Sequence, residues 1–252
     1  MRDRLDRKRA LYTQMKFTVF DTPKSAETFA AGLIAEQVHR QPDSVFGWAT
    51  GGTMLGLYDA LRQMDVSFKQ TRGFNLDEYV GLGPDHPQSY HHYMRQHFFD
   101  HIDIAADHIH LPSGLGNPQE AAAQYERLLV QYGPIDLQLL GIGQNGHIGF
   151  NEPGAAFDGG TQVTALSDTT IAANSRFFDD KTQVPKEAVT MGIGAILKAR
   201  KIVLLACGAV KAKAVQDMAE GPIDPCCPAS ALRGHPNVSV VLDQAAAAHL
   251  SL

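Results

Sequence analysis

Residues 135–154 read IDLQLLGIGQNGHIGFNEPG, and in them a short apolar run leads directly into a glycine-rich loop. Residues 135–143 have the length and the leucine and isoleucine content of a buried strand. The loop carries one imidazole, His147, and one carboxylate, Glu152, among its glycines. Because each glycine costs backbone entropy on folding, a simple connection would not use so many. The stretch therefore predicts a strand whose following loop brings backbone close to a ligand.

Five further segments have the same character, since each is short, apolar and rich in β-branched residues or phenylalanine. These candidate strands are residues 16–20, 44–50, 73–79, 201–208 and 238–243. Helical patterns alternate with them, at residues 25–40, 53–64, 89–102, 118–132 and 211–220. Such alternation predicts crossover connections and a mainly parallel sheet covered on both faces. The predicted fold class is α/β, with a doubly wound, mainly parallel sheet in a single domain.

The composition is that of a globular protein that can fill a core: of 252 residues, 44% are hydrophobic and 19% are charged. The net charge of −5 argues against a nucleic-acid-binding protein, since such proteins usually carry a basic excess. No apolar run reaches the length of a membrane span. We therefore expect neither nucleic acid nor membrane among the partners.

The three cysteines, Cys207, Cys226 and Cys227, form no disulfide framework and lack the spacing of a zinc site. This usage suits a reducing compartment, so we expect a cytoplasmic protein. Residues 1–14 are charged and no apolar region follows them, which argues against a secretory signal. They are interpreted as an N-terminal extension before a domain at residues 15–252.

Ligands of doubly wound sheets bind beyond the carboxyl ends of the strands, so the loops there hold the candidate site. After the second candidate strand, Gly51, Gly52 and Thr53 open a helix whose free amides could attract phosphate. The same sequence also fits an ordinary turn that binds no phosphate. Two cations, Arg176 and Lys211, could meet the same anion, although most such residues are surface charges.

Two loops carry carboxylates. Asp77 and Glu78 are adjacent at the end of the third candidate strand, so one of them could point into a cleft while the other caps the strand end. His147 and Glu152 are five residues apart across glycine, so a chain reversal could bring them within hydrogen-bond reach. A carboxylate partner would orient the imidazole and raise its basicity. A solvated or structural histidine is the alternative.

Six of the 11 histidines lie between residues 91 and 110, which makes this region a candidate metal site. His97 and His101 have the i, i+4 spacing of a zinc pair on a helix. No complete ligand set accompanies them, so we expect a solvated helix face and no metal.

Five motifs together resemble those of the glucosamine-6-phosphate deaminase family. They are FNLDEYVGL, LGIGQNGHIGFNEPG, ANSRFF, QVPKEAVTMGIGAIL and PASALRGHPNVSVVLD, in the family's order. The resemblance extends from about residue 15 to about residue 243. It implies a modified Rossmann-like fold and the conversion of glucosamine 6-phosphate and water to fructose 6-phosphate and ammonia, a hydrolytic deamination that needs no metal or organic cofactor.

The resemblance also implies roles for individual residues. Asp77 of NLDEY is expected to accept the proton during enolisation, His147 to act as the acid and base of ring opening, and Glu152 to support it. Asn145 stands where some members have Asp, and is expected to orient the other groups. The phosphate is expected on Gly51, Gly52, Thr53, Arg176 and Lys211, with residues 165–178 as a lid.

Two other functions are compatible with the same fold. A 6-phosphogluconolactonase would share the fold and the phosphate loop, but the GFNEP string after the histidine favours a deaminase. A non-catalytic sugar-phosphate sensor would keep the fold, but the residues expected to be catalytic are all present. Preference for glucosamine 6-phosphate over its C4 epimer stays open.

The stretch NEPGAAFDGGTQVTAL bears on regulation. Regulated members of the family place hydroxyl residues directly after NEPG and basic residues in the next turns, and add a longer C-terminal tail with a tyrosine. Here Ala155 and Ala156 offer no hydroxyls, and Gln162 and Thr164 stand where positive charge is expected. The resemblance therefore points to the shorter, non-allosteric type, a monomer or small homo-oligomer.

Overall fold

The computed structural model describes residues 15–167, 170–171, 175 and 184–251, so the predicted extension at residues 1–14 lies outside the described residues. Its centre is a seven-stranded sheet in which all neighbouring strands are parallel. In sheet order the strands are β1 (Met15–Phe20), β10 (Val238–Asp243), β9 (Ile202–Ala206), β6 (Leu137–Leu140), β2 (Val45–Trp48), β3 (Arg72–Asn75) and β5 (Ile109–His110).

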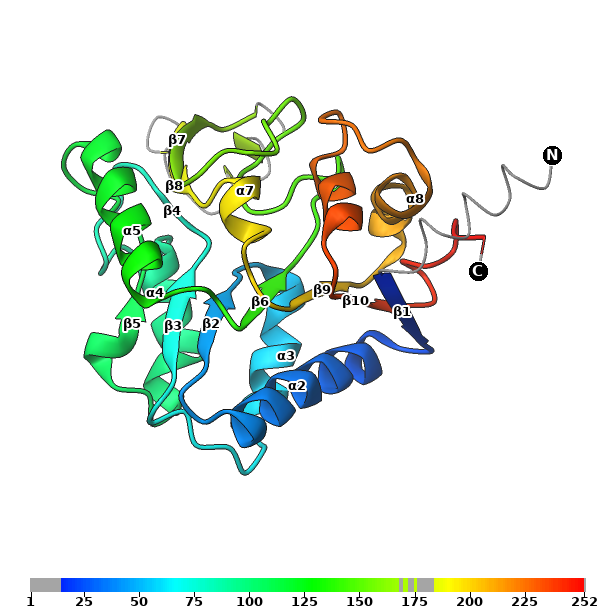
Figure 1. Ribbon diagram of the computed structural model, residues 1–252, viewed down its shortest axis with the longest axis horizontal. Coiled ribbons are helices and arrows are strands. Elements are labelled where there is room, and N and C mark those ends of the chain that lie inside the picture. The colour runs from blue at the N-terminus through cyan, green and yellow to red at the C-terminus, as the bar shows by residue number, and fades with distance from the viewer. Residues whose placement is uncertain (1–14, 168–169, 172–174, 176–183, 252) are drawn as a thin grey trace.

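Helices lie on both faces of this sheet, which confirms the predicted doubly wound α/β fold. On one face lie α2 (Pro23–Arg40) and α3 (Gly52–Arg62), and on the other α7 (Ile193–Ile196) and α8 (Ala212–Glu220) (Figure 1). Further helices are α4 (Tyr90–His97), α5 (Pro118–Tyr132) and the 3₁₀ helices η1 (Phe99–His101), η2 (Ala106–His108), η4 (Ala209–Lys211) and η5 (Pro228–Gly234). None of the helices in the described ranges is long and apolar enough to span a bilayer.

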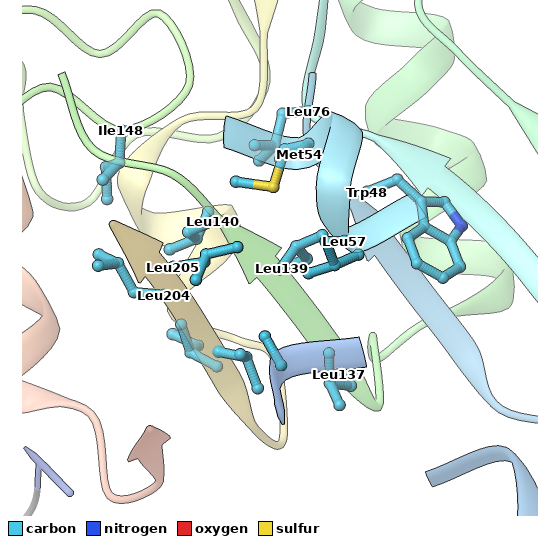
Figure 2. Close-up of a cluster of buried hydrophobic side chains, with 14 of the residues drawn as sticks. Trp48, Met54, Leu57, Leu76, Leu137, Leu139, Leu140, Ile148, Leu204 and Leu205 are labelled. Carbon is cyan, nitrogen blue, oxygen red and sulfur yellow. The ribbon is translucent and has the colours of Figure 1, made fainter. Parts of the chain in front are cut away.

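The central strands β6 and β9 are apolar except for Gln138, because both faces of the sheet are covered there. Every residue of β6 and of β9 is buried. Figure 2 shows side chains of these two strands packed together beneath α3; the labelled residues include Met54, Leu57, Leu139, Leu140, Leu204 and Leu205. This core fixes the strand ends from which the site loops emerge.

The predicted strand at residues 73–79 is wrong as a single element. It divides at Leu76 into β3 and β4 (Asp77–Tyr79), and β4 belongs to a second, antiparallel sheet with β8 (Glu187–Thr190) and β7 (Gln162–Ala165). The Leu76 amide donates to Trp48 O of the large sheet at 3.1 Å, and the Leu76 carbonyl accepts from Met191 N at 2.7 Å. One residue thus joins both sheets, and the sequence pattern did not predict β5, β7 or β8.

Two predicted helices are shorter than their patterns. The pattern at 89–102 ends as an α-helix at His97, because Phe98 leaves the helical region with φ −143° and ψ −63° before η1 begins. The pattern at 211–220 starts with the 3₁₀ turn η4, which holds Lys211, and only then becomes α8. This turn directs the lysine toward the carboxyl ends of the strands.

Candidate active site

A cavity of about 650 Å³ lies beyond the carboxyl ends of β2, β3, β6 and β9. Its walls come from segments far apart in the sequence: residues 49–54, the start of β4, the glycine loop after β6, Thr170 and Lys211. This is the position at which doubly wound sheets bind ligands.

One wall of the cavity is the turn between β2 and α3. Gly51 precedes the first helical residue, Gly52, and both line the cavity together with Thr53. The first amides of a helix have no partner within the helix, so this end attracts anions. Tyr93 Oη donates to Gly51 O at 2.8 Å and fixes the turn. Lys211 lines the same cavity, and burial lowers the pKa of its ammonium group.

The two adjacent carboxylates point to different places, although both are buried. Asp77 lines the cavity. Glu78 instead faces the N-terminus of α4, where Oε1 accepts from Tyr90 N at 3.0 Å and Oε2 accepts from His91 N at 3.0 Å. His91 Nδ1 lies 2.7 Å from Oε2 as well. Glu78 is therefore a structural group, and Asp77 is the carboxylate that a ligand can reach.

Burial raises the pKa of Asp77 well above its ordinary value, and the negative charge of Glu78 raises it further. A carboxylate with a raised pKa is a stronger base than a solvated one. Its position in a cavity, next to a like charge, is typical of a catalytic acid or base.

The glycine-rich loop lets side chains and backbone approach closely, as its sequence predicted. A Cβ on Gly143 would lie 2.3 Å from the His147 ring. Gly149 has φ +57°, and a Cβ there would lie 3.0 Å from Thr190 Oγ1 and 3.4 Å from Asp77 Oδ2. Larger residues would push the imidazole and the loop away from the cavity.

Three residues of this loop form a connected set. Asn145 Nδ2 donates to Glu152 Oε2 at 2.7 Å, and Asn145 Oδ1 accepts from the His147 amide at 3.2 Å. His147 Nδ1 lies 3.5 Å from the same Glu152 oxygen, which is an ion-pair distance rather than a normal hydrogen bond. The carboxylate thus faces one ring nitrogen of His147.

The other oxygen of Glu152 has different partners. Oε1 accepts from Thr170 Oγ1 at 2.7 Å and from Ser167 Oγ at 3.1 Å. Burial favours the neutral acid, but the interactions with His147, Thr170 and Asn145 outweigh it and lower the pKa of Glu152 to about 2. Glu152 is therefore ionised throughout the physiological pH range.

Most residues singled out in the sequence meet at this cavity. Asp77, Asn145, His147, Gly51, Gly52, Thr53 and Lys211 line it, and Glu152 contacts Asn145 directly. Arg176 and much of the expected lid at residues 165–178 lie outside the described residues. The sequence reading missed Leu76, Tyr90 and Thr170, which also line the cavity. Leu76 belongs to NLDEY and Thr170 to residues 165–178, but no role was predicted for either, and nothing in the sequence singled out Tyr90.

The histidine-rich region forms no metal site in the described part of the chain, where no group of three or more His, Cys, Asp or Glu could hold an ion. His91 Nδ1 lies within hydrogen-bond distance of Glu78 Oε2, at 2.7 Å, and His101 Nε2 lies 2.8 Å from Gln96 O. The i, i+4 pair His97 and His101 therefore lacks further ligands among these residues.

The sequence resembles those of known proteins over most of its length. A profile of the family described as glucosamine-6-phosphate isomerases/6-phosphogluconolactonase matches residues 23–241. The chain belongs to this family. The glucosamine-6-phosphate deaminase of Rhodopirellula baltica is 53% identical over 232 residues, which cover 90% of this chain and 92% of that protein. Deaminase 2 of Bacillus subtilis is 49% identical over 244 residues, or 94% and 98% of the two chains.

The solved structures agree on the fold. The structure of a monomeric glucosamine-6-phosphate deaminase matches with a TM-score of 0.91 and 43% identity, over 94% of this chain and all of that one. The 6-phosphogluconolactonase of Trypanosoma brucei matches with a TM-score of 0.76 at 21% identity, over 94% and 98%. At that identity the lactonase shows only the shared fold. The predicted resemblance to deaminases is confirmed.

The raised pKa of Asp77 predicts that Asp77→Asn stabilises the protein at neutral pH. Between the ordinary and the raised pKa, the folded state binds more protons than the unfolded chain, so stability falls as pH rises through that window. Above the window the full penalty is present, and the amide removes it. The melting temperature of Asp77→Asn should exceed that of the wild type at pH 7, and the gap should close at acid pH.

Asp85→Asn is the matched control, because the Asp85 side chain is 96% exposed. It should change the melting temperature little at any pH. A less stable Asp77→Asn variant at pH 7 would show that contacts in the folded state favour the charged form.

Proposed function

We propose that this protein converts glucosamine 6-phosphate and water to fructose 6-phosphate and ammonia. The supporting observation is that one cavity combines a buried carboxylate, an imidazole with an ionised partner, and a helix N-terminus beside a lysine. Relatives at 53% and 49% identity carry the name of this activity.

The first step is opening of the hexosamine ring, in which O1 loses a proton and O5 gains one. His147 is suited to both transfers, since an imidazole can accept a proton at one ring nitrogen and donate one from the other. Ionised Glu152 faces Nδ1 and stabilises the charged ring when it forms. Asn145 spans the Glu152 carboxylate and the His147 amide, so it orients the pair without exchanging a proton itself.

The second step moves a proton from C2 to C1 of the open chain. Asp77 takes the proton from C2 while the aldehyde oxygen O1 gains a proton, which gives an enolamine. Asp77 then returns its proton to C1, and the nitrogen loses the proton that balances the one gained by O1, which leaves an imine at C2. Water hydrolyses this imine to the ketone and releases ammonia. The reaction therefore consumes one water, and we place the enzyme among hydrolases. The raised pKa of Asp77 favours the first half of the transfer, removal of the proton from C2, because it makes the carboxylate a stronger base.

The phosphate is proposed to bind at the α3 N-terminus, where Gly51, Gly52 and Thr53 meet Lys211, with Arg176 as a further cation. Binding energy from this distant group holds C2 over Asp77. The phosphate dianion of the substrate would also offset the free-energy cost of burying the Lys211 ammonium group. We further propose a cytoplasmic enzyme that acts as a monomer, as the deaminase with TM-score 0.91 does.

The purified protein is expected to release ammonia from glucosamine 6-phosphate, and a chelator should leave the rate unchanged. Asp77→Asn should lower turnover by roughly 10²–10⁴-fold, the range for a positioned general base. A coupled ammonia assay and a fructose 6-phosphate assay measure both products. Rapid hydrolysis of 6-phosphogluconolactone without ammonia release would favour the lactonase, and binding without turnover would favour a sensor.

Lys211→Ala is expected to raise KM by roughly 10- to 150-fold, which is the loss of one hydrogen bond to a charged group. Lys213→Ala is the matched control, since its side chain is 67% exposed and pairs with Asp217. The control should stay within about twofold of the wild type. Equal KM values for the two variants would place the phosphate elsewhere.

N-acetylglucosamine 6-phosphate is expected to leave the kinetics hyperbolic and unchanged. The stretch where regulated members carry hydroxyl and basic side chains holds Ala155, Ala156, Gln162 and Thr164 here. Ala155 and Ala156 offer an anionic effector no hydroxyl, and Gln162 offers it no positive charge. The binding free energy lost with these contacts is comparable with the ~1–3 kcal/mol of a typical allosteric coupling. Substrate titrations with and without the effector decide; a sigmoidal curve that becomes hyperbolic would contradict the non-allosteric assignment.

A further inference from the structure

The two oxygens of Glu152 are divided between two parts of the chain. Oε2 contacts residues 141–149, here called the ring-opening loop: it accepts from Asn145 Nδ2 and lies 3.5 Å from His147 Nδ1. Oε1 is held by two hydroxyls from another segment, those of Ser167 and Thr170. Neither hydroxyl belongs to the sequence motifs from which the site was predicted. Their arrangement suggests a function in setting the position of the carboxylate.

The two hydroxyls are themselves connected. Ser167 Oγ lies 2.9 Å from Thr170 Oγ1 and accepts from the Thr170 amide at 3.2 Å. The Ile171 amide donates to Ser167 O at 2.9 Å. The two hydroxyls are thus adjacent, so a carboxylate bound to one of them lies within reach of the other.

The residues next to the two hydroxyls, Leu166 and Ile171, contact other parts of the fold. The Leu166 amide donates to Lys186 O at 2.8 Å, next to β8. The Leu166 side chain is buried in a small apolar cluster with Phe150 and Tyr79, and Ile171 packs against the same cluster. Phe150 follows the ring-opening loop and lines the cavity. The hydroxyls therefore have a defined place relative to that loop.

A Glu side chain has three rotatable bonds, so one hydrogen bond to Asn145 does not fix its second oxygen. Thr170 Oγ1 donates its proton to Oε1, and the single proton of Ser167 Oγ is shared between Oε1 and Thr170 Oγ1. With Oε1 held in this way, Oε2 stays directed at His147 Nδ1, 3.5 Å away. Without these hydroxyls, the carboxylate can rotate away from the imidazole. Thr170 also lines the cavity, so its hydroxyl lies near the space in which a ligand binds.

We infer that Thr170, together with Ser167, is a positioning residue for ring opening, whose hydroxyl holds Glu152 in the orientation that aligns His147. The inference rests on the proposed deaminase function. Thr170 acts through Glu152 and His147, and takes no proton itself.

The test compares Thr170→Val, which replaces the hydroxyl with a methyl group, with Thr170→Ser, which keeps it. Thr164→Val is the matched control, because Thr164 does not line the cavity and its hydroxyl contacts only Ala165 O, at 3.4 Å, among the hydrogen bonds of the described residues. Each variant is assayed for kcat and KM. Its affinity for 2-amino-2-deoxyglucitol 6-phosphate, an acyclic analogue that needs no ring opening, is measured by calorimetry.

Thr170→Val is expected to lower kcat by roughly 10- to 100-fold, the factor for one hydrogen bond to a charged group. KM and the affinity for the acyclic analogue should change by less than about threefold. Thr170→Ser should restore kcat to within about threefold, and Thr164→Val should match the wild type. An unchanged kcat in Thr170→Val, or an equal loss of analogue binding, would overturn the inference, the latter by making Thr170 a direct substrate contact.

A second readout does not depend on the reaction. The ¹⁵N signals of the His147 ring in the ligand-free protein, assigned with His147→Gln, should shift in Thr170→Val and return in Thr170→Ser. If the wild type released no ammonia, the proposed function would fail while this measurement still tested the alignment. Identical ring signals in wild type and Thr170→Val would show that the hydroxyl does not position the imidazole.

Discussion

The antiparallel pairing of β4 with β8 is the interaction on which the site depends. It places Asp77 opposite Thr190, and Thr190 Oγ1 accepts from the Phe150 amide at 3.1 Å. Asn151 Nδ2 donates to Ile148 O at 2.9 Å and to Met191 O at 2.8 Å. The end of β8 therefore holds both the carboxylate of β4 and the loop that carries the imidazole. Asp77 and His147 are thus placed relative to one another by this small sheet as well as by the large one, from which the glycine loop emerges after β6.

The carboxylate that lines the cavity, Asp77, is buried at a cost in stability. Glu78 and Asp77 are both buried, but Glu78 receives amides from α4 and its own strand, as well as the His91 ring. Such hydrogen bonds stabilise a buried charge. Asp77 instead faces a cavity, and burial raises its pKa. These two adjacent carboxylates have different surroundings because successive side chains of β4 point to opposite faces of the small sheet.

Much of the fold could be predicted because its signals are local: the strands of the large sheet are apolar runs, and the glycine loop follows one of them. The second sheet could not, because its strands have only three or four residues each, too few for a periodic pattern to be distinguished. The strand break at Leu76 depends on pairing with Met191, 115 residues away in sequence. Asp77 and His147 were found through motifs, whereas Thr170 contributes through contacts with Glu152 that no spacing along the chain reveals.

The position of β1 at the edge of the large sheet has a consequence for the order of events during synthesis. Its ladder partner there is β10, more than 200 residues further along the chain. At ribosomal rates of about 5–20 residues per second, this strand is made tens of seconds before its partner emerges. For that interval its apolar face must be shielded by local contacts, such as those with α2. Completion of the nascent chain, rather than folding of its first half, therefore closes this side of the sheet.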